Sequence, residues 1–229
     1  MKIGYTAVEM DEGKAKYHDE NLIALEEKDK PKKVTPFFAE FIKEEFVHCD
    51  AIVVTKENIL DLLIHDMDKL ETRMERVSDD KEKSLLAACL EKLEGDIPLC
   101  DMDLNSDEIK LLELADPFSL KPVVQIEGSE DVNEIISLTL DKTNQMFFYT
   151  SGPTESHAWL VDKGSDIVTC AGKIHTDLAR GFIKGDVVPF EDYMSHHNFN
   201  DCKSKGVAKL VERDYIVQPG EVIEIRFNV

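Results

Sequence analysis

The feature that most constrains this chain is an apolar repeat that begins at Leu60 and ends at Val77. Its apolar side chains step by three and four residues, at Leu60, Leu63, Met67, Leu70, Met74 and Val77. This spacing places them along one side of a helix, as in a coiled-coil seam. A second apolar series comes after a break at residues 78–80, at Leu86, Leu90, Leu93 and Ile97. Together they predict an antiparallel coiled-coil hairpin over residues 58–98.

The hairpin has two interpretations. Either its apolar residues only stabilise the fold by packing, or its tip also contacts a partner through Arg73, Arg76 and Lys81.

Strand-like and helix-like segments alternate on either side of the predicted hairpin. We expect strands at residues 2–8, 34–42, 51–55 and 121–126, and helices at 19–29, from 105 onward and at 132–148. Such alternation is typical of an α/β domain. The Ser-Gly-Pro-Thr stretch at 151–154 reads as a linker, which predicts domains at 1–152 and 153–229.

The second predicted domain centres on a helix expected at residues 171–182. Ile174, Leu178 and Phe182 form its apolar stripe. Short strands are expected around it at 158–161, 186–188, 215–217 and 222–227, which describes a β-grasp module. The polar residues of the helix either face solvent or bind a partner. The candidate partner or RNA-binding residues are Lys173, His175, Asp177 and Arg180, extended by Lys184, Lys203, Lys205 and Lys209.

The charge of the chain is unevenly distributed. The net charge is −20, from 27 basic and 47 acidic residues. Residues 1–155 hold 18 Lys and Arg against 36 Asp and Glu, whereas residues 156–229 hold 9 against 11. The first part should repel a phosphate backbone, so any contact with RNA is expected in the C-terminal third. The alternative is that the acidity only keeps the protein soluble.

The sequence offers little support for metals, disulfides or membrane spans. None of the five cysteines forms a C-x-x-C pair, so free thiols are expected and no metal site or cofactor is. No apolar run approaches the roughly 18–20 residues that a membrane span needs. The N-terminus lacks a signal-peptide pattern. We therefore expect a cytoplasmic protein without membrane partners.

A segment after the first expected strand superficially resembles a phosphate-binding loop. Gly13-Lys14 matches the end of such a loop. However, Val8 stands where the first glycine belongs, and Ala15 replaces the serine or threonine that would hold magnesium. Carboxylates precede the glycine, where phosphate requires free backbone N–H groups. We do not expect phosphate binding at this loop.

Several separated motifs closely resemble the C-terminal TGS domain of the YchF/Obg-like ATPase family. They are A-W-L-V at 158–161, A-G-K-I-H-T-D at 171–177, R-G-F-I at 180–183, P-F-E-D-Y at 189–193, D-Y-I-V-Q-P-G-E-V at 214–222 and F-N-V at 227–229. Residues 30–36, 50–53, 62–77, 120–122 and 132–152 resemble upstream parts of the family more faintly, in family order. The resemblance implies a ubiquitin-like β-grasp fold and contacts with the ribosome or other RNA–protein partners.

The departures from the family concern nucleotide chemistry. Besides the phosphate-binding loop, the Asp-x-x-Gly motif is missing at 42–46, and the base-reading N-x-x-E is replaced by Glu127-Gly128-Ser129-Glu130. The loop that carries the family's catalytic histidine is also absent. Phosphoryl transfer depends on these parts for positioning and for charge neutralisation. We therefore predict an α/β (α+β) protein in which a pared-down P-loop-GTPase-like domain with an inserted hairpin precedes the TGS domain.

The predicted function is non-catalytic binding, with no catalytic, cofactor or metal residues and with nucleotide hydrolysis lost. The partner is expected to be a ribosome or an RNA–protein assembly, with other proteins at the hairpin tip. Two alternatives stay open. One is a regulatory protein that retains residual or altered ATP or GTP binding. The other is a competitor of a full-length family member.

Overall fold

The computed structural model describes residues 1–228, and its packing divides the chain into two units. The first unit comprises Met1–Ala15 and Ala39–Thr143. The second comprises Lys16–Phe38 and the chain from Asn144 onward. The expected domains 1–152 and 153–229 rest on the linker at 151–154 and stay a prediction. The packing itself changes at Thr143 and assigns an N-terminal segment to the second unit.

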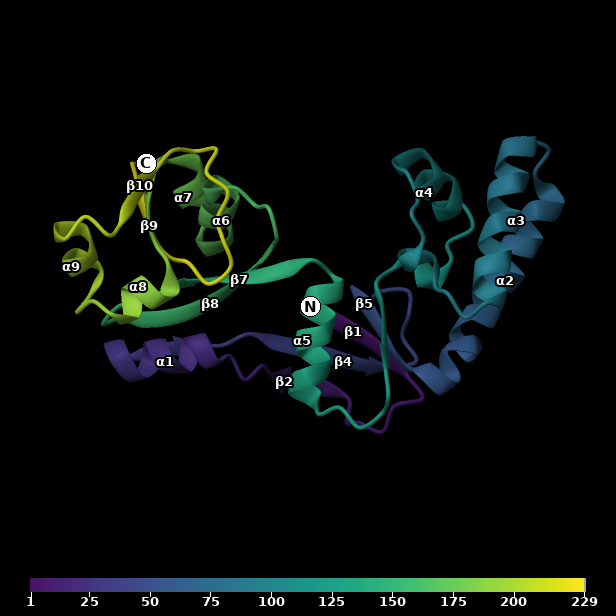
Figure 1. The fold of residues 1–229 in the computed structure, drawn as a ribbon, viewed down its shortest axis with the longest axis horizontal. Coiled ribbons are helices and arrows are strands. Elements are labelled where there is room, and N and C mark those ends of the chain that lie inside the picture. Colours follow the sequence, from purple (N-terminus) through teal and green to yellow (C-terminus); the bar gives the residue numbers. More distant parts are fainter. Residues whose placement is uncertain (229) are drawn as a thin grey trace. The chain divides into compact units, whose positions relative to one another are not determined.

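The first unit is built on a sheet of five strands in the order β2-β4-β1-β5-β6 (Figure 1). The strands are β1 (Lys2–Thr6), β2 (Gly13–Lys16), β4 (Phe38–Lys43), β5 (Ala51–Thr55) and β6 (Val123–Ile126). β1 pairs in parallel with β4 and β5, and β5 pairs in parallel with β6. The first four residues of β5 are fully buried, as expected for a parallel strand covered on both faces.

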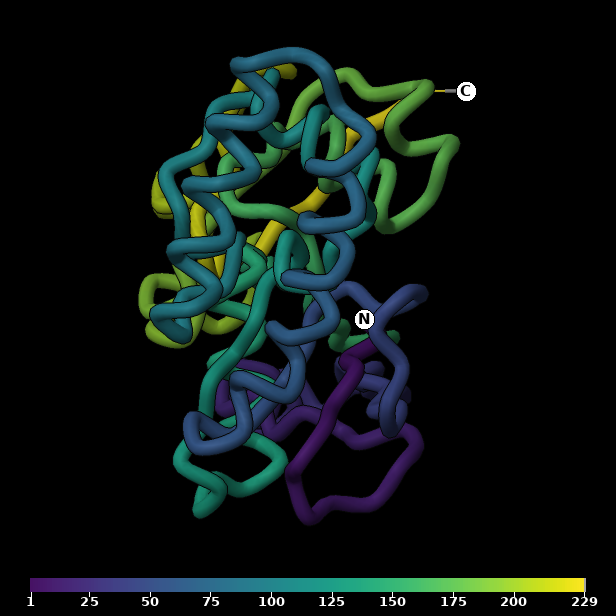
Figure 2. The backbone as a smooth tube through the Cα atoms, turned by 90° about the vertical axis from the view of Figure 1, so that its right-hand side faces the viewer, coloured from purple at the N-terminus to yellow at the C-terminus, as the bar shows by residue number. Residues whose placement is uncertain are grey.

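A helical hairpin forms the largest helical part of the first unit. After a 3₁₀ turn, η1 (Lys56–Asn58), the hairpin consists of α2 (Ile59–Arg76) and α3 (Asp80–Glu94). The two helices run alongside each other in both views (Figures 1 and 2). Asp79 caps α3 by accepting the N–H of Glu82 at 2.8 Å. The two helices of the predicted hairpin are present, with Leu63, Leu70, Leu86 and Leu93 buried between them and their neighbours, whereas the coiled coil stays a prediction.

The ends of the predicted seam are exposed. Leu60 is 44% exposed and Ile97, beyond the end of α3, is 38% exposed. Ile59 and Leu62 are buried at the start of α2 instead. An apolar face shifts in this way because 3.6 residues per turn drifts from a strict seven-residue repeat.

A buried aspartate fixes the segment that follows the hairpin. This segment contains η2 (Leu99–Asp101), α4 (Ser106–Glu113) and η3 (Phe118–Leu120). Asp66 of α2 is fully buried and accepts the backbone N–H groups of Phe118 at 2.6 Å and Ser119 at 2.7 Å. Burial raises the pKa of this carboxyl, while these hydrogen bonds act in the opposite direction.

The second unit contains a six-stranded sheet in the order β10-β9-β11-β7-β8-β3. Its strands are β3 (Lys33–Thr35), β7 (Gln145–Thr150), β8 (Glu155–Asp162), β9 (Phe182–Val188), β10 (Lys209–Val211) and β11 (Val222–Phe227). β7 and β8 form an antiparallel pair, as do β9 and β11, whereas β11 meets β7 in parallel. The mixed order around α6 (Ile167–Ile174) is that of a β-grasp fold, which confirms the predicted fold class.

The two faces of this sheet have separate cores. Phe148 and its neighbours on one face pack with Ile167 and Cys170 of α6. Tyr149, the next residue of β7, points to the other face and packs with Leu22 and Leu25. That face is covered by α1 (Glu20–Asp29), α8 (Phe190–Met194) and α9 (Phe199–Ser204). The N-terminal segment is therefore part of the core of the second unit.

Two expected elements are wrong in their bounds. The strand expected at 34–42 is divided into β3 and β4, which belong to different sheets. Pro36, which has no N–H to donate to a ladder, lies at the division. The helix expected at 132–148 is α5 (Val132–Lys142) followed by β7. Asn144 adopts a left-handed conformation with φ of 55° between them, and aromatic residues suited to a strand follow it.

The central helix expected at 171–182 is also corrected. It is two helices, α6 and α7 (Thr176–Arg180), and Phe182 already lies in β9. α6 begins earlier than expected because Asp166 caps it, accepting the N–H of Thr169 at 2.7 Å. Residues 215–217 contribute only a single bridge, between Ile216 and Asp166, and β10 forms the edge of the sheet instead.

Candidate functional sites

The predicted partner-binding helix is interrupted at His175, which is the C-cap residue of α6 and the N-cap residue of α7. Its Nδ1 accepts the N–H of Asp177 at 3.1 Å. A nitrogen that accepts a backbone N–H carries no proton, so the 3.7 Å approach of the Asp177 carboxylate is not an ion pair in this state. The Asp177 carboxylate instead pairs with Arg180 at 3.0 Å. The His175 side chain therefore serves as the N-cap of α7.

Most of the other predicted cations are already paired with carboxylates. Lys184 binds Glu212 at 2.8 Å, and Lys205 binds Asp201 at 3.1 Å. Lys209 lies 4.7 Å from the centre of the Tyr215 ring. Lys173 is exposed at the end of α6. The predicted set is thus not one open basic surface, because acidic neighbours offset much of its charge.

Lys203 of α9 belongs to an ion-pair network around the buried carboxylate of Asp186 in β9. It pairs with Asp186 at 3.2 Å and also contacts Glu224. Arg226 donates to the two carboxylate oxygens of Asp186 at 2.7 and 2.8 Å. Burial alone would raise the pKa of Asp186, but hydrogen bonds from Arg226 and Lys203 outweigh burial and lower this pKa. Lys203 consequently has a structural role.

A cavity of about 510 Å³ lies in the first unit, lined by the loops that follow β1 and β6. In open α/β sheets, ligands bind at the carboxyl ends of the strands. Here the lining is acidic, with Glu9, Asp11, Glu12, Glu130 and Asp131. The loop after β1 is held down by its own chain, because the Tyr5 hydroxyl donates to the carbonyl of Met10 and Glu12 accepts the N–H of Lys43.

Four backbone amides between β6 and the first turn of α5 are already occupied by carboxylates of the chain. Glu130 accepts the N–H groups of Glu127 at 2.9 Å and Gly128 at 2.8 Å. At the start of α5, Asp131 and Glu134 each accept the other's backbone N–H at 2.9 Å. The hydrogen bond from Glu127 lowers the pKa of Glu130, so this carboxylate is charged at neutral pH. The cavity therefore presents negative charge where a phosphate needs free N–H groups.

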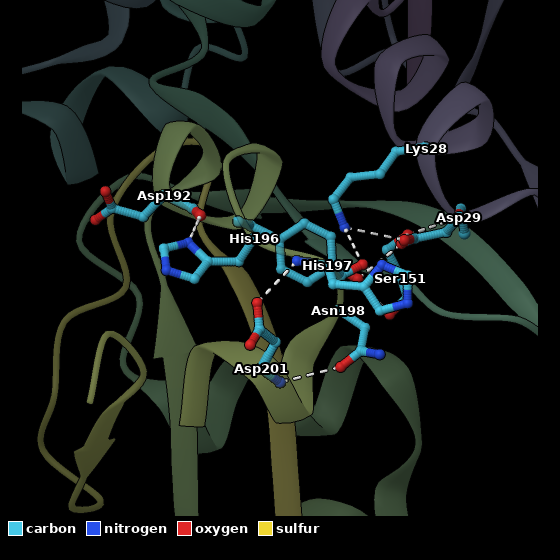
Figure 3. Close-up of polar contacts among 10 residues, drawn as sticks. Lys28, Asp29, Ser151, Asp192, His196, His197, Asn198 and Asp201 are labelled. Carbon is cyan, nitrogen blue, oxygen red and sulfur yellow. Dashed lines mark hydrogen bonds and ion pairs between the residues drawn. The ribbon is translucent and has the colours of Figure 1, made fainter. Parts of the chain in front are cut away.

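A second cavity, of about 300 Å³, lies in the second unit at the end of α1. Lys28 Nζ pairs with Asp29 at 3.2 Å, and the side chains are only 12% and 6% exposed. Lys28 also donates to the carbonyl of His197 at 3.2 Å and lies 4.0 Å from the Tyr193 ring centre. Asp29 in turn accepts the hydroxyls of Ser151 at 2.5 Å and Tyr193 at 2.7 Å (Figure 3).

The arrangement does not prepare a nucleophile. The hydroxyl of Ser151 donates to a carboxylate, whereas an activated serine donates to an imidazole. Burial, followed by the contact with Asp29, raises the pKa of Tyr193 and keeps its hydroxyl protonated. Among residues 1–228, no group of three or more His, Cys, Asp or Glu side chains is placed to hold a metal ion. The cavity can bind a ligand, and its polar groups have no catalytic geometry.

Sequence reasoning missed Lys28, Asp29 and His197 as members of one site. Lys28 and His197 are 169 residues apart in the chain. The only available signal was the cluster of lysines at residues 28–33, within the otherwise acidic part of the sequence.

Within residues 1–228, none of the helices is long and apolar enough to cross a membrane.

Comparison with known proteins finds similarity over parts of the chain. Residues 146–228 match the family model YchF-GTPase_C, described as a protein of unknown function. The chain is 33% identical over 135 residues to the ribosome-binding ATPase YchF of Haemophilus influenzae, covering 58% of this chain and 36% of that protein. It is 34% identical over 121 residues to human Obg-like ATPase 1, covering 53% of this chain and 31% of that protein.

Two further comparisons extend over more of the chain. The ribosome-binding ATPase YchF of Bacillus subtilis is 26% identical over 237 residues, covering 74% of this chain and 65% of that protein. The structure of the Schizosaccharomyces pombe YchF GTPase superposes with a TM-score of 0.79 at 15% identity, covering 99% of this chain and 97% of that chain, which shows a shared fold.

The fold is shared with the Schizosaccharomyces pombe YchF GTPase. Residues 146–228 match the YchF-GTPase_C family, and more than half of the chain is similar in sequence to YchF and Obg-like ATPases. The chain spans about a third of the length of the first curated relatives that it matches.

Proposed function

We propose that this chain is a ribosome-associated binding protein of the YchF family that does not hydrolyse nucleotide. The cavity at the ends of β1 and β6 is the observation that carries this proposal. On its β6 side, carboxylates of the chain occupy the backbone amides of Glu127, Gly128 and Asp131, which a phosphate there would need. Kinases and GTPases obtain their rate from positioned phosphates and bound magnesium, and Val8 and Ala15 stand where a P-loop has its first glycine and its magnesium-binding hydroxyl.

The association with ribosomes is supported by the names of the relatives. The Haemophilus and Bacillus proteins are ribosome-binding ATPases, and the family model covers the β-grasp unit of this chain. In the proposal this unit provides the contact. Lys173 is an exposed cation on α6, and Arg180 is an exposed residue whose guanidinium carries only one exposed carboxylate partner.

Two measurements test the proposal. Isothermal titration with ATP and with GTP should give no heat of binding, and micromolar binding of either would contradict the loss of nucleotide chemistry. Co-sedimentation with ribosomes should weaken as salt rises. A Lys173→Glu/Arg180→Glu double variant should sediment less with ribosomes than the parent. An unchanged profile would contradict the contact through α6 and α7.

Competition with a full-length family member is a second candidate function. The match between the β-grasp unit and complete ATPases of the family favours it, because similar surfaces select similar partners. In a competition assay, this chain should displace a full-length relative from ribosomes. Simultaneous binding of both proteins would contradict this function.

A further inference from the structure

The cavity at the end of α1 presents hydrogen-bonding groups that are held in fixed positions. Asn198 accepts the N–H of Asp201 through Oδ1 at 3.0 Å, which leaves its amide nitrogen as a donor. His197 is held at both backbone groups, because Asp201 accepts its N–H at 3.1 Å and Lys28 donates to its carbonyl. Its ring is exposed at the cavity (Figure 3). The Asn198 amide and the backbone of His197 are thus held in place.

The charges that line this cavity are balanced. Lys28 pairs with Asp29, and Glu224 pairs with Lys203. The cavity therefore has no net charge to select an ion. Its remaining polar groups are the amides of Asn198 and Asn200, the hydroxyls of Ser151 and Tyr193, and the exposed His197 imidazole. The Phe199 ring is buried, with Lys203 Nζ at 5.0 Å from its centre, so the His197 ring is the one available for stacking. Amide groups hydrogen-bond the edges of nucleobases, and flat rings stack on them.

A basic turn adjoins the cavity. Lys30 and Lys32 follow α1 directly and are exposed. The backbone N–H of Lys32 donates to the carbonyl of Pro153, which lines the cavity, at 3.2 Å. Within the described residues, the ammonium groups of Lys30 and Lys32 have no carboxylate partner, whereas Lys33 forms an ion pair with Glu155 at 2.8 Å. The turn can place two lysines on a phosphate backbone beside the cavity.

We propose that this cavity binds one unpaired base of single-stranded RNA, with Lys30 and Lys32 on the adjacent phosphates. The proposal deepens the ribosome-associated role and rests on it for the choice of RNA as the partner. A base within a duplex keeps its Watson–Crick edge paired, so a pocket that contacts this edge selects single strands. The cavity of about 300 Å³ lies at the lower end of the range for small-molecule sites, which suits a single base.

The test uses the full chain and a short fluorescent single-stranded RNA oligomer. A second oligomer of equal length carries abasic sugars and the same phosphates. His197→Ala removes the ring and keeps the backbone contacts. Asn198→Asp keeps the cap of α9 and removes the amide donor. Both variants should bind the base-bearing oligomer about 5-fold or more weakly, since stacking contributes about 1–3 kcal/mol per base and 1.4 kcal/mol is tenfold.

The lysine turn should give a different signature. In the Lys30→Gln/Lys32→Gln variant, the slope of log K against log salt should fall by about 1.4, because each phosphate contact on a single strand contributes about 0.7. His197→Ala should leave this slope unchanged. A Lys83→Gln/Lys110→Gln variant, with the same change of charge on exposed residues of the first unit, serves as the matched control and should bind as the parent does. Urea unfolding followed through Trp159 fluorescence shows that each variant of the second unit is folded.

Three results would overturn the proposal. They are equal binding of the abasic oligomer, unchanged affinity in both His197→Ala and Asn198→Asp, and displacement of the RNA by polyglutamate at equal concentration. Ribosome co-sedimentation separates this proposal from the broader one. If ribosome binding persists while the oligomer does not bind, only the base pocket fails. If the oligomer binds as expected and the ribosome does not, only the ribosomal role fails.

Discussion

Replacing Asp186 with asparagine should destabilise the β-grasp unit by about 2 kcal/mol at neutral pH. The Asp186 side chain is only 3% exposed and accepts two hydrogen bonds from Arg226 and one from Lys203. Asparagine keeps one oxygen but places an NH₂ group against cationic donors. Removing one partner of a fully buried ion pair costs about 3–5 kcal/mol.

The expected loss of unfolding free energy lies below that range because Arg226 and Lys203 each keep another way to stabilise their charge. The Arg226 side chain is 52% exposed and can reach water, and Lys203 retains Glu224. Hydrogen bonds to charged groups contribute about 1.5–3 kcal/mol, which agrees with a loss of about 2 kcal/mol. Glu212→Gln, which breaks the exposed pair with Lys184, is the matched control and should cost less than about 1 kcal/mol.

The pH dependence follows from the lowered pKa of Asp186. The carboxyl titrates at lower pH in the folded state than in the unfolded state, where its pKa is about 3.9. Its stabilisation is therefore complete well above that pKa and is lost as the pH falls through the folded-state pKa. The difference in unfolding free energy between parent and Asp186→Asn should be constant from pH 5 to 8, as an approximate range, and shrink below about pH 4.

Urea unfolding followed by tryptophan fluorescence measures this difference. Trp159, the single tryptophan, lies in β8 of the same sheet, so its signal reports the second unit directly. A destabilisation no larger than that of Glu212→Gln would refute the argument that burial strengthens the Asp186 network. A difference that grows as the pH falls would refute the assigned sign.

Three further changes test other parts of the fold. Gly4→Ala should prevent the first unit from folding, because a Cβ atom would lie 1.9 Å from the backbone carbonyl oxygen of Glu45; circular dichroism of the purified chain measures the loss. Tyr149→Phe removes the hydroxyl that Asp19 accepts at 2.9 and 3.0 Å and should cost about 1–3 kcal/mol in urea unfolding, a neutral result contradicting the burial argument. Asp66→Asn removes an acid whose pKa is raised by burial, so the parent should gain stability relative to this variant as the pH falls, which thermal unfolding at pH 7 and pH 5 compares.

Periodic segments of the sequence were sufficient to predict the hairpin and the last strand. The spacing of three and four residues between Leu63 and Leu70 is visible in the sequence because both side chains are buried in the core that α2 shares with α3. The strand expected at 222–227 is present as β11, with Ile223 in the core and Glu224 exposed, although Val222 is buried as well and Phe227 is 49% exposed. Burial on one face imposes a period that the sequence has to display.

Local backbone events were not predictable from apolar spacing. Asn144 ends one element and begins another by adopting a left-handed conformation, within a polar stretch at 141–145 that separates Leu140 from Met146. His175 interrupts the expected helix because its side chain accepts a backbone N–H, which competes with helix continuation as other capping side chains do. In both cases a single residue outweighed a pattern extending over several turns.

The candidate sites depended on pairing in space. Lysines 184, 203 and 205 look like a basic surface in the sequence, yet each lies against a carboxylate that is distant in the chain or one turn away. A cation is available to a partner only if its own protein leaves it unpaired. Sequence composition counts charges and does not show which of them are already neutralised.

The assignment of residues 16–38 to the second unit changes the electrostatic argument more than any other finding. By sequence, this segment belongs to the acidic part of the chain. In the structure, the second unit holds 14 Lys and Arg against 17 Asp and Glu, whereas the first holds 13 against 30. The first unit therefore repels a polyanion, whereas the second unit, with its small net charge, repels it much less. Because Lys30 and Lys32 lie on that second unit, the least repulsive part of the protein also carries two ammonium groups without a carboxylate partner among the described residues.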